Sequence, residues 1–242
     1  MYKLLIIFLC AGIGVSAQET LMLRSPSVSN NKIAFAYGGD IWTAERDGSH
    51  PVRLTVNIGV EANPMLSPDG NWIAFTANYD GNGDVYVIAA GGGQPKRLTF
   101  HPSVDIVRSW DGNDKIVFSS GRGKWHFLEN NLFEVNVNSG AETMLPMPQA
   151  SQGSVSPDGR FTAYIRAIVV NEWSCFRLYR GGDMARIWIF NNQTHEVEEI
   201  PAAKSNSSNP VWTYNNTIYF LSDRDNHYVN IYKYNVPSKA VT

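Results

Sequence analysis

The chain has little cysteine, with two residues in 242, Cys10 and Cys175. Cys10 lies in an N-terminal apolar run that we expect to be removed, so the rest of the chain keeps one cysteine, which excludes an internal disulfide. The chain also lacks a basic excess, with 20 Lys and Arg against 22 Asp and Glu, which argues against a nucleic-acid partner. Beyond residue 15, no apolar run approaches the roughly 20 residues that a membrane-spanning helix needs.

The N-terminus has the pattern of a secretory leader. Lys3 precedes the apolar run LLIIFLCAGIGV, which ends at the small-residue site Val15-Ser16-Ala17. This pattern predicts a signal peptide over residues 1–17, cleaved after Ala17. A lipoprotein leader is disfavoured because Leu9 precedes Cys10 where a small residue is usual. We therefore expect an exported protein, periplasmic or extracellular, whose mature part is residues 18–242.

The tetrapeptide SPDG occurs twice, at Ser67–Gly70 and at Ser156–Gly159, and a short apolar, aromatic run follows each copy. Pro-Asp-Gly presets the dihedral angles of a tight turn and supplies a residue that tolerates positive φ, so each copy predicts a reversal between two strands. Two copies in one setting indicate a repeat. Weaker copies align when the apolar run is used as the anchor. The five anchors end at Phe35, Phe75, Phe118, Tyr164 and Phe220.

The repeat has a nearly constant body and one variable connection. From the second strand of one copy to the anchor of the next there are 32–34 residues, whereas the connection between the anchor strand and the second strand varies from 6 to 23 residues. After each second strand comes a short strand such as VRLT (Val52–Thr55). Such a body of four strands is typical of β-propeller blades, which bury both faces by packing around an axis. The sequence predicts an all-β propeller over residues 18–242, with five blades visible.

Several segments resemble a known family. The pattern NPxxSPDGxxIAF, followed by GDVYV and by GGxPKRLT, resembles the Pro-Asp repeats of the TolB and tricorn protease propellers. The segments LYRGGDMARIWIF and SNPVWTYNNTIYFLSDRD resemble the N-terminal propeller of the tricorn protease family more specifically. Tyr179–Gly182, before an Ile-Trp-Ile strand, is the most specific of these because generic Pro-Asp repeats lack it. The resemblance covers nearly the whole mature chain.

The resemblance implies the first, six-bladed propeller of a large serine peptidase that trims oligopeptides. In that family a second propeller, a PDZ domain and a catalytic core with a Ser-His-Ser-Glu tetrad follow. The implied role is to gate or dock oligopeptides for a core absent from this chain, with oligopeptides, the downstream peptidase and PDZ domains, and further copies of the chain as partners. Family members without a leader are cytoplasmic. The alternative is a free-standing, TolB-like periplasmic propeller that binds proteins and does no chemistry.

The residues themselves predict no catalytic, cofactor or metal site. The string QGSVS around Ser154 lies directly before a blade turn and does not match a nucleophile elbow. His195-Glu196 begins like a zinc motif, but no histidine follows four residues later. The loop Asp80–Asp84 has alternating oxygen side chains, yet it lacks the glycine and glutamate of a calcium-binding EF-hand, and we interpret it as a solvated loop. Gly91–Gly93 is interpreted as a turn.

The longest connection is the segment RAIVVNEWSCFRLYRGGDMAR, residues 166–186, in the fourth repeat. It combines arginines with aromatic residues, and guanidinium groups suit the carboxylates of peptides. Because all the variable connections fall at one corner of the repeat, they should lie on one face of the propeller. Contacts with another domain, or packing within the blade, remain an alternative role for this segment. The candidate peptide-contact residues are Arg177, Tyr179, Arg180 and Arg186.

Overall fold

The computed structural model describes residues 22–125, 129–166, 179–182, 184–225 and 227–242. The predicted signal peptide, residues 1–17, lies outside this part. The described residues form twenty strands in five four-stranded sheets. The predicted all-β propeller is therefore confirmed with five blades, and a sixth blade is not among the described residues. Within these ranges, no helix is long and apolar enough to cross a membrane.

Each blade takes its four strands from one continuous stretch of sequence. Blade 1 contains β1 (Arg24–Val28), β2 (Lys32–Tyr37), β3 (Asp40–Glu45) and β4 (Val52–Arg53). Blade 2 contains β5 (Glu61–Leu66), β6 (Trp72–Ala77), β7 (Asp84–Ala89) and β8 (Lys96–Arg97). Blade 3 contains β9 (Asp105–Asp111), β10 (Lys115–Ser120), β11 (Asn131–Asn136) and β12 (Glu142–Met144). Blade 4 contains β13 (Gln152–Val155), β14 (Phe161–Ile165), β15 (Ile187–Asn191) and β16 (Val197–Glu199). Blade 5 contains β17 (Ser207–Thr213), β18 (Thr217–Ser222), β19 (Asn230–Asn235) and β20 (Ala240–Val241).

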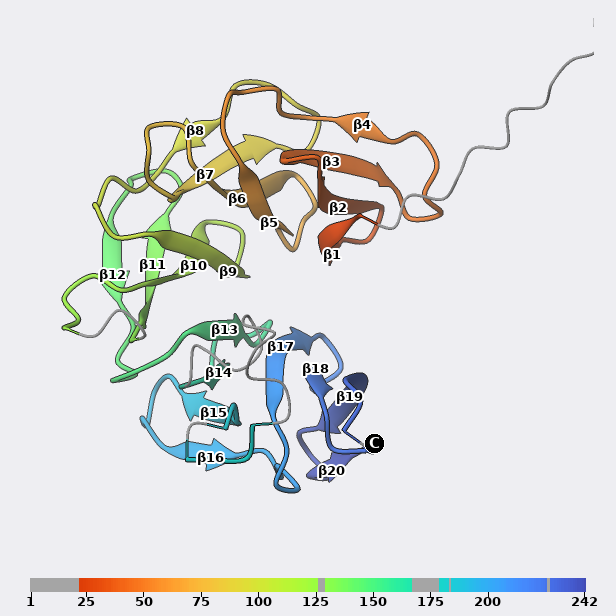
Figure 1. Cartoon of the computed structure of the whole chain (residues 1–242), viewed down its shortest axis with the longest axis vertical. Coiled ribbons are helices and arrows are strands. Elements are labelled where there is room, and N and C mark those ends of the chain that lie inside the picture. The colour runs from red at the N-terminus through yellow and green to blue at the C-terminus, as the bar shows by residue number, and fades with distance from the viewer. Residues whose placement is uncertain (1–21, 126–128, 167–178, 183, 226) are drawn as a thin grey trace, which may run out of the picture.

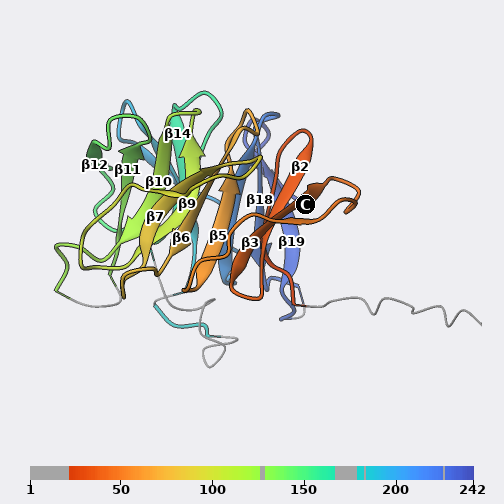
Figure 2. The same ribbon diagram turned by 90° about the horizontal axis from the view of Figure 1, so that it is seen from above.

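The blades stand around a common centre. Figure 1 shows the first strand of each blade at the centre of the ring and the fourth strand at its periphery, and Figure 2 shows the same blades from the edge. All strand pairs within a blade are antiparallel neighbours in sequence. The ends of the second strands and the starts of the third strands therefore lie on one face of the ring. The fourth strand is shorter than expected, since β4 ends at Arg53 instead of Thr55.

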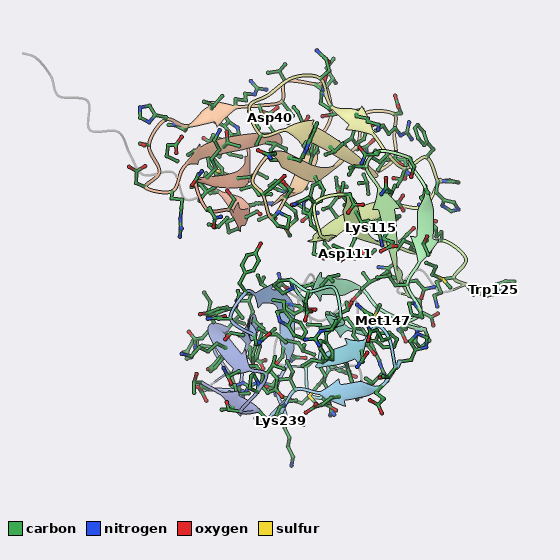
Figure 3. The ribbon with its side chains drawn as sticks, turned by 180° about the vertical axis from the view of Figure 1, so that it is seen from behind. Asp40, Asp111, Lys115, Trp125, Met147 and Lys239 are labelled. Carbon is green, nitrogen blue, oxygen red and sulfur yellow. The ribbon has the colours of Figure 1, made fainter. Side chains whose placement is uncertain are left out.

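The core lies between neighbouring blades. Ile41 of blade 1 packs with Ile73 and Phe75 of blade 2, and comparable clusters join blades 2 and 3, blades 3 and 4, and blades 4 and 5. Figure 3 labels Met147, which is fully buried where blades 3 and 4 meet. A sheet that packs on both sides needs apolar residues on both faces, which explains why the anchor strands are continuously hydrophobic instead of alternating. Burial of this apolar surface is the main stabilising contribution to the ring.

The two SPDG turns have the same hydrogen bonds. In the second copy, Ser156 Oγ donates to Asp158 Oδ1 at 2.6 Å and accepts from Phe161 N at 2.9 Å. Gly159 N donates to the Ser156 carbonyl at 2.8 Å, and Gly159 adopts φ +70°. The first copy repeats this arrangement at Ser67–Gly70. The motif is thus a turn between the first and second strands of a blade, as the sequence predicted.

Candidate functional site

A cavity of about 630 Å³ lies at the centre of the ring. All five first strands contribute to its wall, which identifies it as an axial cavity. On β9, Ile106 and Arg108 line the cavity, while Val107, which lies between them in sequence, is buried against blade 2. Successive side chains of a strand point to opposite faces, and on β9 one set meets the cavity while the other meets the neighbouring blade. The remaining wall is mostly amide and hydroxyl side chains, including Asn63 of β5.

Three ionisable side chains line the axial cavity. Arg24 comes from β1, Arg108 comes from β9, and Asp223 follows β18. Arg108 Nε donates to Ser119 Oγ at 2.9 Å, which orients its guanidinium. Asp223 is 6% exposed and accepts a hydrogen bond from the backbone N–H of Asn206 at 2.8 Å. The cavity wall therefore includes two guanidinium groups and one carboxylate, and Arg108 and Asp223 both have partners within the protein.

Two of the four predicted peptide-contact residues lie at the rim of this cavity. Arg180 Nη1 donates to Asp223 Oδ2 at 2.8 Å, and its Nη2 is 3.1 Å from His227 Nδ1. The Tyr179 carbonyl accepts from Asn206 Nδ2 at 2.9 Å and from Arg180 Nη1 at 3.0 Å. Asp223 and Asn206, which line the cavity, thus hold the end of the blade 4 connection against blade 5.

The other two predicted residues are not brought to this position. Arg186 Nη1 is 3.2 Å from Glu199 Oε1 on β16, the peripheral strand of blade 4, and is not among the cavity-lining residues. Arg177 lies outside the described residues. Sequence reasoning also missed Arg24, Arg108 and Asp223. The alternation on β9 is a signal that could have indicated Arg108.

Buried polar groups fix the first strand of blade 3, which carries Arg108. Val85 N donates to Thr99 Oγ1 at 2.9 Å, and Arg97 Nε donates to the Thr99 carbonyl at 2.9 Å. Asp105, the first residue of β9, pairs with Arg122 at 2.5 Å. Burial raises the pKa of Asp105, while hydrogen bonds from Ser120 and Thr99 and the charge of Arg122 lower it.

The same arrangement occurs one blade earlier. Ile41 N donates to Thr55 Oγ1 at 2.9 Å, and the Thr55 hydroxyl donates to Glu61, the first residue of β5. Tyr79 Oη also donates to Glu61, at 2.7 Å. We call these two groups, centred on Thr55 and Thr99, the threonine latches. The Thr55 group joins the third strand of blade 1 to Glu61 of blade 2, and Thr99 accepts from the third strand of blade 2 next to Asp105 of blade 3. Fixing the third strand is therefore the structural role of the threonine in the RLT motif.

The remaining motifs have structural partners. Asp80 and Asp84 both pair with Arg97, at 2.8 and 2.7 Å, and Asn82 Nδ2 donates to the His101 carbonyl at 2.7 Å. The carboxylates of this loop are therefore paired with an arginine. Across the part of the chain that the structure describes, no group of three or more His, Cys, Asp or Glu residues could hold a metal ion. What the axial cavity offers chemically is hydrogen bonding from amide and hydroxyl side chains.

Comparison with known proteins agrees with this architecture. Residues 20–242 match the family described as the tricorn protease N-terminal beta propeller domain. The chain belongs to this family. Tricorn protease homolog 1 of Streptomyces coelicolor is 29% identical to this tricorn-type propeller over 205 residues, which are 84% of the chain and 19% of the relative. The propeller thus spans about a fifth of the length of that curated relative.

Solved structures share the fold of the tricorn-type propeller. The crystal structure of the tricorn protease superposes with a TM-score of 0.75 at 23% identity, covering 91% of this chain and 22% of that one. TolB from Acinetobacter baumannii superposes with a TM-score of 0.66 at 17% identity, covering 90% of this chain and 53% of that one. At these identities the structural likeness establishes the fold alone.

Proposed function

We propose that this tricorn-type propeller receives oligopeptides in its axial cavity and presents them to a peptidase core outside the described chain. The observation that carries the proposal is the polar axial cavity of about 630 Å³, to which all five first strands contribute. Pockets that bind small ligands commonly have about 300–1,000 Å³, so a few peptide residues fit this volume. Side-chain amides on the wall, such as Asn63, can both donate to and accept from a peptide backbone.

We further propose that Tyr179 and Arg180 form part of the entrance through which peptides pass. Their contacts with Asp223 and Asn206 support this role, because these contacts hold the blade 4 connection at the cavity rim. Arg177 remains a predicted contact residue. Arg186, which faces Glu199, has a packing role within blade 4 in this proposal.

We also propose that the protein is exported, with cleavage between Ala17 and Gln18. The short apolar run and the Val-Ser-Ala site support this proposal. N-terminal sequencing of the protein recovered from a secreting host should begin at Gln18. Recovery of the intact N-terminus in the cytosol would overturn the proposed location.

Peptide binding by the purified mature chain tests the proposed function. A pool of fluorescein-labelled hexapeptides should bind saturably by fluorescence anisotropy, and Ile106→Trp should weaken binding because the larger indole narrows the cavity. Val104→Trp is the matched control, since Val104 is 52% exposed and does not line the cavity. Saturable capture of folded proteins with no peptide binding would favour a TolB-like interaction propeller instead.

The same mixtures test whether the chain itself cleaves peptides. We expect every peptide to be recovered intact, because acyl transfer needs a nucleophile, a base and an oxyanion site in one place, and the axial cavity offers binding groups only. Turnover above buffer, with a fluorophosphonate probe labelling a serine of this chain, would overturn the scaffold role.

A further inference from the structure

We infer that the axial cavity recognises the backbone of an extended peptide, with the side-chain amides of Asn63 and Asn209 as the binding groups. This inference rests on the proposed function, because it names the part of the peptide that the same cavity contacts. Both residues line the cavity, and they come from the first strands of blades 2 and 5. Figure 1 shows these strands, β5 and β17, on opposite sides of the centre of the ring. A peptide in the cavity therefore meets an amide from each side.

A β-bulge in the first strand positions each of these amides. In β5, the two residues Asn63–Pro64 lie opposite a single anchor residue of β6, and in β17 Asn209–Pro210 lie opposite a single anchor residue of β18. Ser25–Pro26 of β1 has the same arrangement. By contrast, β13 of blade 4 pairs with β14 without a register shift. A bulge inserts one extra residue into a strand and changes the direction of its side chain, and bulges are frequent beside binding sites.

The inserted residue has a left-handed backbone conformation in each of these bulges. The φ angle is +49° at Ser25, +52° at Asn63 and +53° at Asn209. This conformation costs free energy for a residue other than glycine, although asparagine tolerates it better than most. Glycine adopts it without strain but has no side chain. The chain therefore has a polar side chain where backbone geometry alone favours glycine, and strained positions of this kind are typical of ligand-binding sites.

The two amides keep hydrogen-bonding capacity for a ligand. Ser25 Oγ donates to Asn63 Oδ1 at 3.5 Å, a long and therefore weak bond. Within the described part of the chain, Asn63 Nδ2 and the side-chain amide of Asn209 have no hydrogen-bond partner. Gln152 Oε1 accepts from Asn209 N at 2.7 Å, so blade 4 holds the backbone of this bulge while the Asn209 side chain stays exposed. A side-chain amide can pair with both the N–H and the C=O of a peptide backbone.

Recognition of the backbone predicts that affinity depends on the peptide N–H groups more than on the side chains. Three labelled hexapeptides test this with the unaltered mature chain: an alanine-rich parent, a version with N-methyl groups at alternate residues, and a version with some alanines replaced by glutamine. We expect the N-methylated peptide to bind about tenfold more weakly than the parent, because it lacks backbone donors. The glutamine version should bind within about twofold of the parent.

Substitution by glycine separates binding from folding. Asn63→Gly and Asn209→Gly keep the left-handed backbone accessible and remove only the amide, so each should lower the affinity for the parent peptide about fivefold. The double variant should also bind the parent and the N-methylated peptide with nearly equal affinity. Asn216→Gly is the matched control, because Asn216 has φ +54° in the exposed turn between β17 and β18 and does not line the cavity. Its affinity should be that of the wild type, and thermal melts compare the stability of all variants.

Each outcome bears on one of the two proposals. Affinity that falls in both cavity variants and not in Asn216→Gly supports backbone recognition by these amides. Saturable binding with equal affinity for the parent and the N-methylated peptide overturns backbone recognition and leaves the peptide-receiving function standing. Discrimination that persists unchanged in the double variant overturns the assignment to Asn63 and Asn209. A thermal midpoint below that of Asn216→Gly in either cavity variant contradicts the strain on which this assignment rests. Absence of saturable binding for every peptide overturns both proposals.

Discussion

The packing around Gly153 on β13 leaves no room for a larger residue. A Cβ added at Gly153 would collide with Cδ1 of Leu132, a fully buried side chain of blade 3. Gly153 is not among the glycines with positive φ, so packing alone constrains it. We expect Gly153→Ala to lower the free energy of unfolding by about 1–3 kcal/mol, the usual cost of overpacking a core. Urea denaturation of the mature chain measures this change.

Gly91 provides the matched control for Gly153→Ala. No atom lies within 4 Å of a Cβ added at Gly91, and its φ is outside the positive range. Gly91→Ala should therefore be neutral, or stabilising by about 0.4–1 kcal/mol through the unfolded state. Equal loss of stability in both variants would show that contact with Leu132 is not the cause.

The contribution of Asp105 to folding stability should depend on pH, and the direction of this dependence follows from its burial. Its pKa is raised above the usual 3.8, so between 3.8 and the raised value the folded state binds more protons than the unfolded state. The contribution of Asp105 to stability is thus largest at low pH and falls as pH rises. We expect the stability difference between wild type and Asp105→Asn to shrink from about pH 4 to about pH 7 in urea titrations.

Asp158 should show the opposite sign. The Ser156 hydroxyl, which donates to this carboxylate, is the main cause that lowers the pKa of Asp158 to about 2. Its contribution is therefore present above the usual 3.8 and lost as pH falls toward 2. If Asp158→Asn and Asp105→Asn gave stability differences with the same pH slope, the assignment of the Asp105 effect to burial would fail.

At the scale of elements, the threonine latch at Thr99 binds the third strand of blade 2 next to Asp105, where blade 3 begins. Thr99→Val keeps the shape but removes the hydroxyl that accepts from Val85 N, leaving a buried donor without its partner. Such a loss costs about 1–3 kcal/mol, and we expect Thr99→Val to lower the free energy of unfolding by that amount. Chemical denaturation followed by tryptophan fluorescence measures the change, since Trp110 lies in the cluster between these blades.

Thr143→Val is the control for this element, because Thr143 is exposed on the peripheral strand β12. Its effect should stay within about 0.5 kcal/mol, as is usual for surface substitutions. A neutral Thr99→Val would contradict the latch, and the RLT motif would then need an explanation other than this buried hydrogen bond.

The elements were more predictable from sequence than the site. The anchor runs ending at Phe75 and Phe118 are continuously apolar. Such a run predicts a buried strand from the local sequence alone. By contrast, the contact of Arg180 with Asp223 joins residues from two blades, and no local pattern encodes which partner a side chain meets. Arg186 illustrates this limit of local sequence patterns. It is an arginine of the same connection as Arg180, yet the fold places it against Glu199.

At the scale of the whole molecule, blade 5 has one covered and one open face. Trp212 and Phe220 pack against blade 4, whereas Val211 and Ile231 are 54% and 73% exposed. Val211 lies opposite Tyr219, which extends the apolar surface across two strands. Contiguous exposed apolar surface favours association. We expect the mature chain to self-associate in sedimentation velocity, and Val211→Thr with Ile231→Thr to shift it toward monomer.

Tyr214→Ser is the control for this surface. Tyr214 is 75% exposed but lies in the turn between β17 and β18, outside the strands of the open face. Its substitution should leave the sedimentation profile unchanged. A monomeric wild-type chain at all concentrations would contradict association through blade 5.

Because each blade is drawn from one uninterrupted stretch of sequence, we expect the order of assembly to follow the order of synthesis. A chain that has emerged from a ribosome as far as Arg97 already contains both sheets that enclose the first inter-blade cluster. Each further blade then adds to a finished neighbour, and contacts between nearby stretches of sequence favour fast folding. We therefore expect the propeller to acquire its core stepwise from the N-terminal side, with only the newest blade face open at any moment during translation.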